Sequence, residues 1–239
     1  MSFQYLSPDN CQLQPNRIDI WEFSLEILPS GAKLLLSEDE LNRARRFYFP
    51  HHQRRFIVAR AMLRVILARY LQLDAASLAF TYSKHGKPRI ENPVGLEFNL
   101  SHSGDIALLA IGQESPLGVD IEFFSSRPYA GIASHSFSSN ETDTFSNLPK
   151  YLKPLAFFHV WAQKEALIKA CGLGLSYPTR QFDVPVVPPT HDLVDDTLHR
   201  KQWRITSFMP RVACSAALCH TDAIQKIYYV PVDPVILIK

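Results

Sequence analysis

The sequence predicts an α+β protein built from two units, each containing strands and helices. Residues 21–27 alternate between apolar and polar side chains, which is the period of a half-buried strand. A capping-box pattern at residues 37–40 (SEDE) predicts a helix start, and a second helix follows with an apolar stripe over residues 56–70. The same capping pattern recurs at residues 138–141 (SSNE), ahead of a predicted long helix over about 153–171. The two units are therefore either a weak internal duplication or two unrelated lobes.

A turn and a hairpin complete the first unit. The turn is HGKP at residues 85–88. The hairpin has strands over residues 98–101 and 106–111, which meet at the Ser-Gly pair 103–104. We therefore assign residues 1–115 to an N-terminal lobe.

The second unit, residues 116–239, begins with a strand over residues 117–123. A polar stretch at 125–147 is expected to be loop with one short helix, and two glycines would end the long helix that follows. Further strands complete this unit and are expected around residues 203–209, 212–218 and 227–232.

Composition sets limits on the class of protein. The chain has 239 residues, a net charge of +2 and a hydrophobic fraction of 46%, which are ordinary for a globular protein. Its four cysteines form no CxxC motif, so we expect neither a disulfide framework nor a zinc site. The first ten residues do not resemble a signal peptide, and the longest apolar run, residues 106–111, is too short to span a bilayer. These observations predict a soluble, cytoplasmic protein without a membrane partner.

Positive charge is concentrated in one region. Residues 41–70 contain no Asp or Glu, and such a region should steer polyanions toward it. The net charge of +2 is nevertheless small for a nucleic-acid-binding protein, so no nucleic-acid partner is expected. The eight arginines of the region are Arg43, Arg45, Arg46, Arg54, Arg55, Arg60, Arg64 and Arg69.

Three carboxylates give the most specific chemical signal. In LGVDIE (117–122), Asp120 and Glu122 share one face of a strand about 7 Å apart. In WAQKEALIK (161–169), Glu165 lies one helical turn from Lys169. If the three carboxylates converge, they repel one another unless a divalent cation balances them, and Mg²⁺ prefers such oxygen ligands. Taken singly, the two segments also fit an exposed strand face and a surface ion pair.

These motifs, read together, resemble those of a known family. LGVDIE followed after about forty residues by WAQKEALIK is similar to the signature of the 4′-phosphopantetheinyl transferases of the larger, two-lobed kind. The segments RARRF (43–47), HGKP (85–88) and NLSHSG (99–104) agree with this family, and the resemblance spans about residues 36–215. It implies two similar α+β lobes in a pseudo-twofold arrangement, with the active site in the cleft between them, in a monomer.

The resemblance also implies an activity. Members of this family transfer the 4′-phosphopantetheine arm of coenzyme A to a serine hydroxyl of apo acyl or peptidyl carrier proteins, and release adenosine 3′,5′-bisphosphate. These carriers serve polyketide, nonribosomal peptide and fatty acid synthesis, and the cofactor is Mg²⁺ or possibly Mn²⁺. Two other classes remain open: another magnesium-dependent phosphate enzyme, and a catalytically silent relative that binds coenzyme A or nucleic acid.

Site residues follow from the resemblance, position by position. Glu165 is the expected base for the serine proton, Lys169 would stabilise the departing bisphosphate, and His102 would contact a phosphate. The expected metal ligands are Asp120, Glu122 and Glu165, with Glu122 the least consistent of them in the family. The residues expected to bind coenzyme A are Arg43, Lys87, Ser101, His102, Lys164 and Lys169.

The carrier-binding surface is less well defined by the sequence. The basic stretch 41–70 could dock an acidic carrier protein, bind coenzyme phosphates, or simply solvate its helix. Four aromatic residues near the predicted loop could contact a carrier helix or pack locally, namely Phe123, Phe124, Tyr129 and Phe137.

Overall fold

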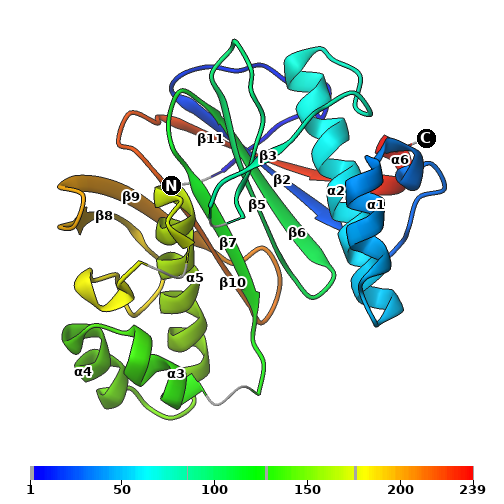
Figure 1. Ribbon diagram of the computed structural model, residues 1–239. Coiled ribbons are helices and arrows are strands. Elements are labelled where there is room, and N and C mark those ends of the chain that lie inside the picture. Colours follow the sequence, from blue (N-terminus) through cyan, green and yellow to red (C-terminus); the bar gives the residue numbers. More distant parts are fainter. Residues whose placement is uncertain (1–2, 85, 127–128, 175–176, 239) are drawn as a thin grey trace.

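A computed structural model describes residues 3–84, 86–126, 129–174 and 177–238, and it contains two main β-sheets (Figure 1). The first sheet contains, in spatial order, β1 (Gln4–Tyr5), β11 (Lys226–Val232), β2 (Arg17–Ser24), β6 (Ile106–Gln113) and β5 (Leu96–Ser103). The second contains β7 (Gly118–Phe123), β10 (Cys214–His220), β9 (Lys201–Phe208) and β8 (His191–Asp196). A small ribbon pairs β3 (Thr81–Tyr82) with β4 (Pro88–Arg89). The predicted α+β class is therefore confirmed.

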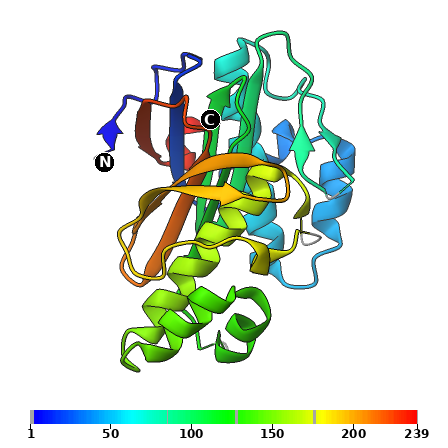
Figure 2. The same ribbon diagram turned by 90° about the vertical axis from the view of Figure 1, so that its left-hand side faces the viewer.

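Helices cover each sheet on one side. The helices are α1 (Glu38–Arg45), α2 (Pro50–Leu71), α3 (Tyr129–Ser136), α4 (Ser139–Asn147), α5 (Lys153–Cys171) and α6 (Pro234–Leu237). Short 3-10 turns lie at Ala32–Leu35 and Thr179–Gln181. Figure 2 shows α3 and α4 gathered at one end of α5, away from α1 and α2. None of the helices in the described ranges has both the length and the apolar composition of a membrane span.

The capping patterns are confirmed, whereas the loop prediction needs a correction. Ser37 and Ser138 both form complete capping boxes, with Glu40 and Glu141 respectively. Residues 125–147 were expected to hold one short helix, but this stretch contains two, α3 and α4. The capping box at Ser138 begins α4, and α5 follows over the residues predicted for the long helix.

The prediction of a half-buried strand near residues 21–27 is wrong, because β2 is buried on both faces. Trp21 and Phe23 pack toward α2, whereas Ile18 and Ile20 pack against the second sheet in a core that lies between the two sheets. Polar residues are tolerated there because they are paired. Glu22, for example, accepts hydrogen bonds from Tyr229 and Arg211.

The last strand also differs from the prediction. β11 was expected to complete the second unit, but it pairs in parallel with β2 in the first sheet, where Val230 lies opposite Trp21. The chain therefore passes to the second sheet after β6 and returns for its final strand. The lobe boundary at residue 115 and the similarity of the two lobes stay predictions.

Two buried histidines predict a loss of stability in mild acid. His159 on α5 and His220 on β10 are almost fully buried, and burial lowers the pKa of each to about 4. The unfolded chain takes up these protons near pH 6.5, so stability is complete above that pH and falls as the pH drops toward 4. We expect a loss of about 2 kcal/mol per histidine at pH 5.

Denaturant unfolding between pH 7.5 and pH 5 measures this loss. His159→Gln should flatten the pH dependence by about half, whereas the same change at the exposed His135 should leave the slope unchanged. An unaltered slope in His159→Gln would contradict the assignment.

Candidate active site

The two sheets meet edge to edge at β5 and β7, and side chains join them there. Each is an edge strand within the described part of its sheet, so neither forms a backbone ladder with the other. Alternate residues of β5, namely Asn99, Ser101 and Ser103, point toward β7. Asn99 Oδ1 accepts the backbone N–H of Val119 at 2.8 Å, and Ser103 Oγ accepts that of Phe123 at 3.0 Å. These side chains satisfy edge donors that a neighbouring strand would otherwise bond.

Helix α5 packs closely on β7 because of Gly118. A Cβ atom at Gly118 would lie 2.1 Å from the carbonyl oxygen of Ala166 and 2.5 Å from the amide nitrogen of Ala170. Only glycine permits this distance between a strand and a helix backbone. The close approach brings Asp120 on β7 within reach of Lys169 on α5.

The junction of β5 and β7 is called the seam below. Asp120 lies at its centre and is 3% exposed. Its Oδ1 atom accepts hydrogen bonds from Lys169 Nζ at 2.6 Å and from Ser101 Oγ at 2.8 Å. Its Oδ2 atom is buried and has no hydrogen-bond partner among the described residues. A buried carboxylate oxygen without a partner is costly, so this atom is available to a ligand or an ion.

Glu165 lies half-buried on α5, one turn before Lys169, and lines the same cavity of about 260 Å³ as Lys169 and Lys87. The pKa of Glu165 is raised, first by burial and then by the negative charge of Asp120, with Lys169 acting in the opposite direction. It accepts no hydrogen bond from any described side chain or backbone group. A carboxylate with a raised pKa is better suited to accept a proton near neutral pH than an ordinary glutamate.

The three predicted metal ligands share this region but do not all converge. Their carboxylate oxygens do not all lie within 4.8 Å of one another, the spacing that would let one ion contact all three. Glu122 accepts a hydrogen bond from Ser103 Oγ at 3.4 Å. Lys169 pairs with Asp120 rather than with Glu165, so part of the predicted charge balance is supplied by a lysine. The assignment of the three as metal ligands stays a prediction.

A second cavity of about 430 Å³ adjoins the first. It is lined by Arg43, His102 and Glu122, and it shares Gly86, Pro88 and Leu100 with the cavity of Glu165. Burial, followed by the positive charges of Lys169 and Arg55, lowers the pKa of His102. His85, the first residue of the predicted HGKP turn, lies outside the described residues.

Several other residues line this second cavity, and the sequence analysis assigned none of them an individual site role, although the arginines among them belong to the basic stretch 41–70. They are His52, Arg55, Phe56, Ala59 and Arg60 on α2, together with Tyr82 on β3. The helical residues repeat at intervals of three and four, so they occupy one face of α2. This spacing could have identified them, because the predicted apolar stripe already included Phe56 and Ala59.

Lys87 lies in the first cavity, as predicted, but its ammonium bonds to the backbone. Its Nζ atom donates to the carbonyl oxygens of Lys169 at 2.8 Å and Leu117 at 3.3 Å. Lys87 thus ties the turn to the end of α5 and to the residue before β7. Burial is the main cause of its lowered pKa. A role with coenzyme A stays a prediction.

The structure does not bring Lys164 to either cavity, so its predicted phosphate contact stays a prediction without support from its position. Its side chain is buried on a different face of α5 from Glu165, because consecutive helical residues point about 100° apart. The ammonium forms an ion pair with Glu141 at 3.0 Å and donates to the carbonyl oxygens of Thr179 and Phe182. Lys164 therefore holds the α4 capping box and the segment before β8.

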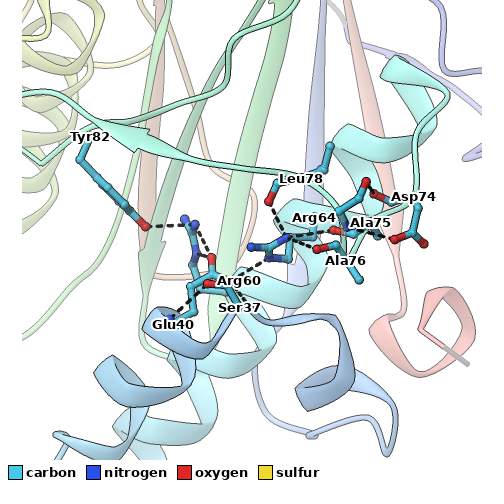
Figure 3. Close-up of polar contacts among 10 residues, drawn as sticks. Ser37, Glu40, Arg60, Arg64, Asp74, Ala75, Ala76, Leu78 and Tyr82 are labelled. Carbon is cyan, nitrogen blue, oxygen red and sulfur yellow. Dashed lines mark hydrogen bonds and ion pairs between the residues drawn. The ribbon is translucent and has the colours of Figure 1, made fainter.

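The predicted positive field of residues 41–70 is partly neutralised within the fold. Six of the eight arginines form ion pairs. Arg60 and Arg64 are buried against Glu40 (Figure 3). Arg54 and Arg55 share Asp105. Among the described residues, Arg43 and Arg46 are the arginines of this stretch without such a pair.

The aromatic residues considered for carrier contact pack mainly into the C-terminal lobe. Phe137 is fully buried, and its ring stacks on Phe157. Phe124 stacks on Phe158, and Tyr129 lies against Phe157. The alternative that these residues pack locally is therefore the correct one for these three.

Similarity to known proteins agrees with this arrangement of two lobes and a charged seam. Residues 21–114 match the family described as 4′-phosphopantetheinyl transferase, N-terminal, and residues 116–217 match the 4′-phosphopantetheinyl transferase superfamily. The chain is 33% identical over 220 residues to 4′-phosphopantetheinyl transferase HetI of Nostoc sp., which covers 88% of this chain and 90% of the relative.

Other similar proteins are also described as phosphopantetheinyl transferases. The Sfp transferase of Bacillus subtilis is 33% identical over 150 residues, covering 62% of this chain and 66% of the relative. The mouse L-aminoadipate-semialdehyde dehydrogenase-phosphopantetheinyl transferase is 30% identical over 211 residues, covering 77% of this chain and 68% of the relative.

The fold and the site thus define a two-domain transferase. The chain belongs to the 4′-phosphopantetheinyl transferase family, as the motifs predicted, and its activity is the transfer of phosphopantetheine to carrier proteins.

Proposed function

We propose that coenzyme A is the donor and that a serine hydroxyl of an apo acyl or peptidyl carrier protein is the acceptor. The observation that carries this proposal is the seam itself. Glu165 and Lys169 line a cavity that adjoins one lined by Arg43 and His102, and Lys169 donates a hydrogen bond to the buried Asp120. A donor with a pyrophosphate and a separate 3′-phosphate needs charged groups at both places. Because one chain supplies both cavities, we also propose a monomer.

The residues of the seam fit a magnesium or manganese ion. Asp120 Oδ2 and the Glu165 carboxylate are hard oxygen donors without hydrogen-bond partners among the described residues, and Glu122 is a third candidate. When bound, such an ion would neutralise developing charge on the pyrophosphate oxygens. Asp120 and Glu165 would hold it, and Lys169 would keep its own contact with Asp120 Oδ1.

The protein groups account for the proton and the leaving group. The serine oxygen forms a bond to the phosphorus that carries pantetheine, and the bond from this phosphorus to the bridging oxygen breaks. Glu165 takes the serine proton as the new P–O bond forms. The bridging oxygen keeps the electron pair and leaves with adenosine 3′,5′-bisphosphate, stabilised by the ammonium of Lys169.

The remaining cavity residues would hold coenzyme A. Arg43 is free of ion pairs among the described residues, and His102 lines the same cavity, so both can contact a phosphate. Ser101 donates a hydrogen bond to Asp120 in this structure. It would therefore orient that carboxylate as well as contact the coenzyme.

Mass spectrometry of the carrier tests the proposal directly. The protein, incubated with coenzyme A, Mg²⁺ and an apo carrier, should add one phosphopantetheine to the carrier. A carrier whose acceptor serine is replaced by alanine should gain nothing. Absence of any mass gain across a panel of apo acyl and peptidyl carriers would refute the proposed reaction.

We expect Lys87→Ala mainly to weaken coenzyme A binding. A lost charge-assisted contact predicts a rise in the KM for coenzyme A of roughly tenfold, with a smaller fall in kcat. Lys84→Ala, which removes an exposed lysine three residues earlier, is the matched control and should be neutral. If kcat falls while KM does not change, the contact of Lys87 with the Lys169 carbonyl matters more than any contact with the coenzyme.

A further inference from the structure

A group of three metal-ligating residues lies outside the site described above. Cys171 is the last residue of α5, Asp196 is the last residue of β8, and His199 lies in the turn between β8 and β9. One ligand atom from each lies within 4.8 Å of the other two. Their spacing along the chain matches no zinc motif, which is why the sequence argued against such a site. The fold, however, assembles a thiol, a carboxylate and an imidazole.

Cys171 and His199 each direct a proton at the same carboxylate oxygen of Asp196. Cys171 Sγ lies 3.6 Å from Asp196 Oδ2, and His199 Nδ1 lies 2.8 Å from that atom. Tetrahedral ligands of a zinc ion, each about 2.0 to 2.3 Å from the metal, lie roughly 3.3 to 3.8 Å apart. Small side-chain rotations would therefore let one ion replace both protons.

The carboxylate of Asp196 is held by groups that would remain in place. Its side chain is fully buried. Tyr177 donates its hydroxyl to Oδ1 at 2.5 Å, the backbone N–H of His199 donates to the same atom at 3.1 Å, and Trp203 Nε1 donates to Oδ2 at 3.3 Å. Hydrogen bonds of this kind orient the ligands of metal sites.

The charges of the cluster also favour a cation. Burial, and then the negative charge of Asp196, raises the pKa of Cys171 to about 12. For Asp196 itself, burial opposes ionisation, but hydrogen bonds led by that of Tyr177 outweigh it and lower the pKa to about 2. The carboxylate is thus ionised while the thiol beside it is not. A divalent cation would balance the charge of the carboxylate, and it would lower the pKa of the thiol, because a thiol that ligates a metal loses its proton.

We propose that Cys171, Asp196 and His199 form a binding site for a divalent ion of the zinc class. The ligands are Cys171 Sγ, Asp196 Oδ2 and His199 Nδ1, with water as the fourth. Sulfur, nitrogen and oxygen donors together suit zinc and exclude magnesium. Binding releases the thiol proton to solvent, and the single proton of the neutral imidazole moves from Nδ1 to Nε2 through exchange with solvent, which leaves Nδ1 free to bind the ion. His199 is 39% exposed, so both water and the ion can reach the cluster.

The site would fix the C-terminal end of α5, the helix that carries Glu165 and Lys169. Cys171 follows Lys169 by two residues on α5, and a bound ion would fasten this end of the helix to the β8–β9 turn. None of its ligands is shared with the Asp120 region. The proposal therefore does not depend on the reaction assigned above.

Cobalt(II) titration of the full chain distinguishes the two regions. Co²⁺ bound at Cys171 should give one equivalent of a thiolate-to-cobalt charge-transfer band, whereas the oxygen ligands at Asp120 cannot. Zinc should displace the cobalt with a dissociation constant of about 1 µM or tighter. Cys171→Ser should abolish the band, and His199→Ala should weaken binding by more than about 100-fold. The thermal midpoint should rise with zinc only where the site is intact.

Two matched variants serve as controls. Cys11→Ser removes a partly buried thiol outside the cluster. His191→Ala removes a histidine on β8 whose Nδ1 atom is hydrogen-bonded to Thr206. Both variants should keep the band. If Cys171→Ser does not fold, the exposed His199→Ala still decides the matter. A band that survives in Cys171→Ser overturns the proposal, as does an unchanged cobalt affinity in His199→Ala or the absence of any band in the unchanged protein.

Discussion

Replacing Asp120 by asparagine should lower phosphopantetheine transfer on the order of 1,000-fold. The change keeps the size of the side chain and one oxygen for Lys169 and Ser101. It removes the negative charge of the only described carboxylate that is both buried at the seam and paired with Lys169. Metal affinity should fall with activity, because Oδ2 is the proposed ligand atom. Initial rates with an apo carrier, together with calorimetric titration of Mn²⁺, measure the two effects.

The matched control is Glu122→Gln. Glu122 shares the strand face with Asp120, yet it is more exposed, and the hydrogen bond that it accepts from Ser103 is long at 3.4 Å. We expect a smaller loss there, of about tenfold. Equal activity of Asp120→Asn and the unchanged protein, at a thermal midpoint that shows both to be folded, would refute the metal assignment.

Local patterns were sufficient to predict much of this site. Strand alternation placed Asp120 on the face opposite Val119, and helical spacing placed Glu165 and Lys169 on one side of α5. The same helical geometry, applied to Lys164, would have turned that lysine away from its neighbour Glu165. Its partner Glu141 could not be predicted, because that contact joins two helices in the tertiary fold.

Long-range pairing accounts for the main errors in the fold. β11 and β2 lie about 200 residues apart in sequence, and a parallel pair leaves no turn signal between its strands. The alternation in β2 correctly indicated a strand, but it could not show that the second sheet covers the polar face. The Cys171 cluster was missed for the same reason, since its three ligands meet only through tertiary contacts.

Glu40 has two structural roles, and the sequence predicted only the first of them. Its capping box with Ser37 was predicted and is present. The sequence gave no sign that the same carboxylate also neutralises Arg60 and Arg64, which were counted toward a positive surface. Figure 3 shows both guanidinium groups directed at Glu40, with Arg64 also donating to backbone carbonyls such as that of Leu78.

We therefore expect Glu40→Gln to cost about 3–5 kcal/mol of the free energy of unfolding. Glutamine keeps the shape and one acceptor for the cap, but it leaves two guanidinium groups, 8% and 2% exposed, without a negative partner. Although burial raises the pKa of Glu40, the charge of Arg60 and the hydrogen bonds lower it overall, so the carboxylate is ionised at neutral pH. Denaturant titration monitored by the fluorescence of Trp21, which lies in the same core, measures the loss.

Glu38→Gln provides the comparison on the same helix. Its ion pair with Arg45 is between side chains 70% and 62% exposed, so its loss should change stability by no more than about 0.5 kcal/mol. Similar small losses for both variants would mean that water reaches Arg60 and Arg64. A large loss at Glu40 alone, with a raised KM for coenzyme A, would show that this buried network also positions Arg43 on α1, because α1 is fixed to α2 through Glu40.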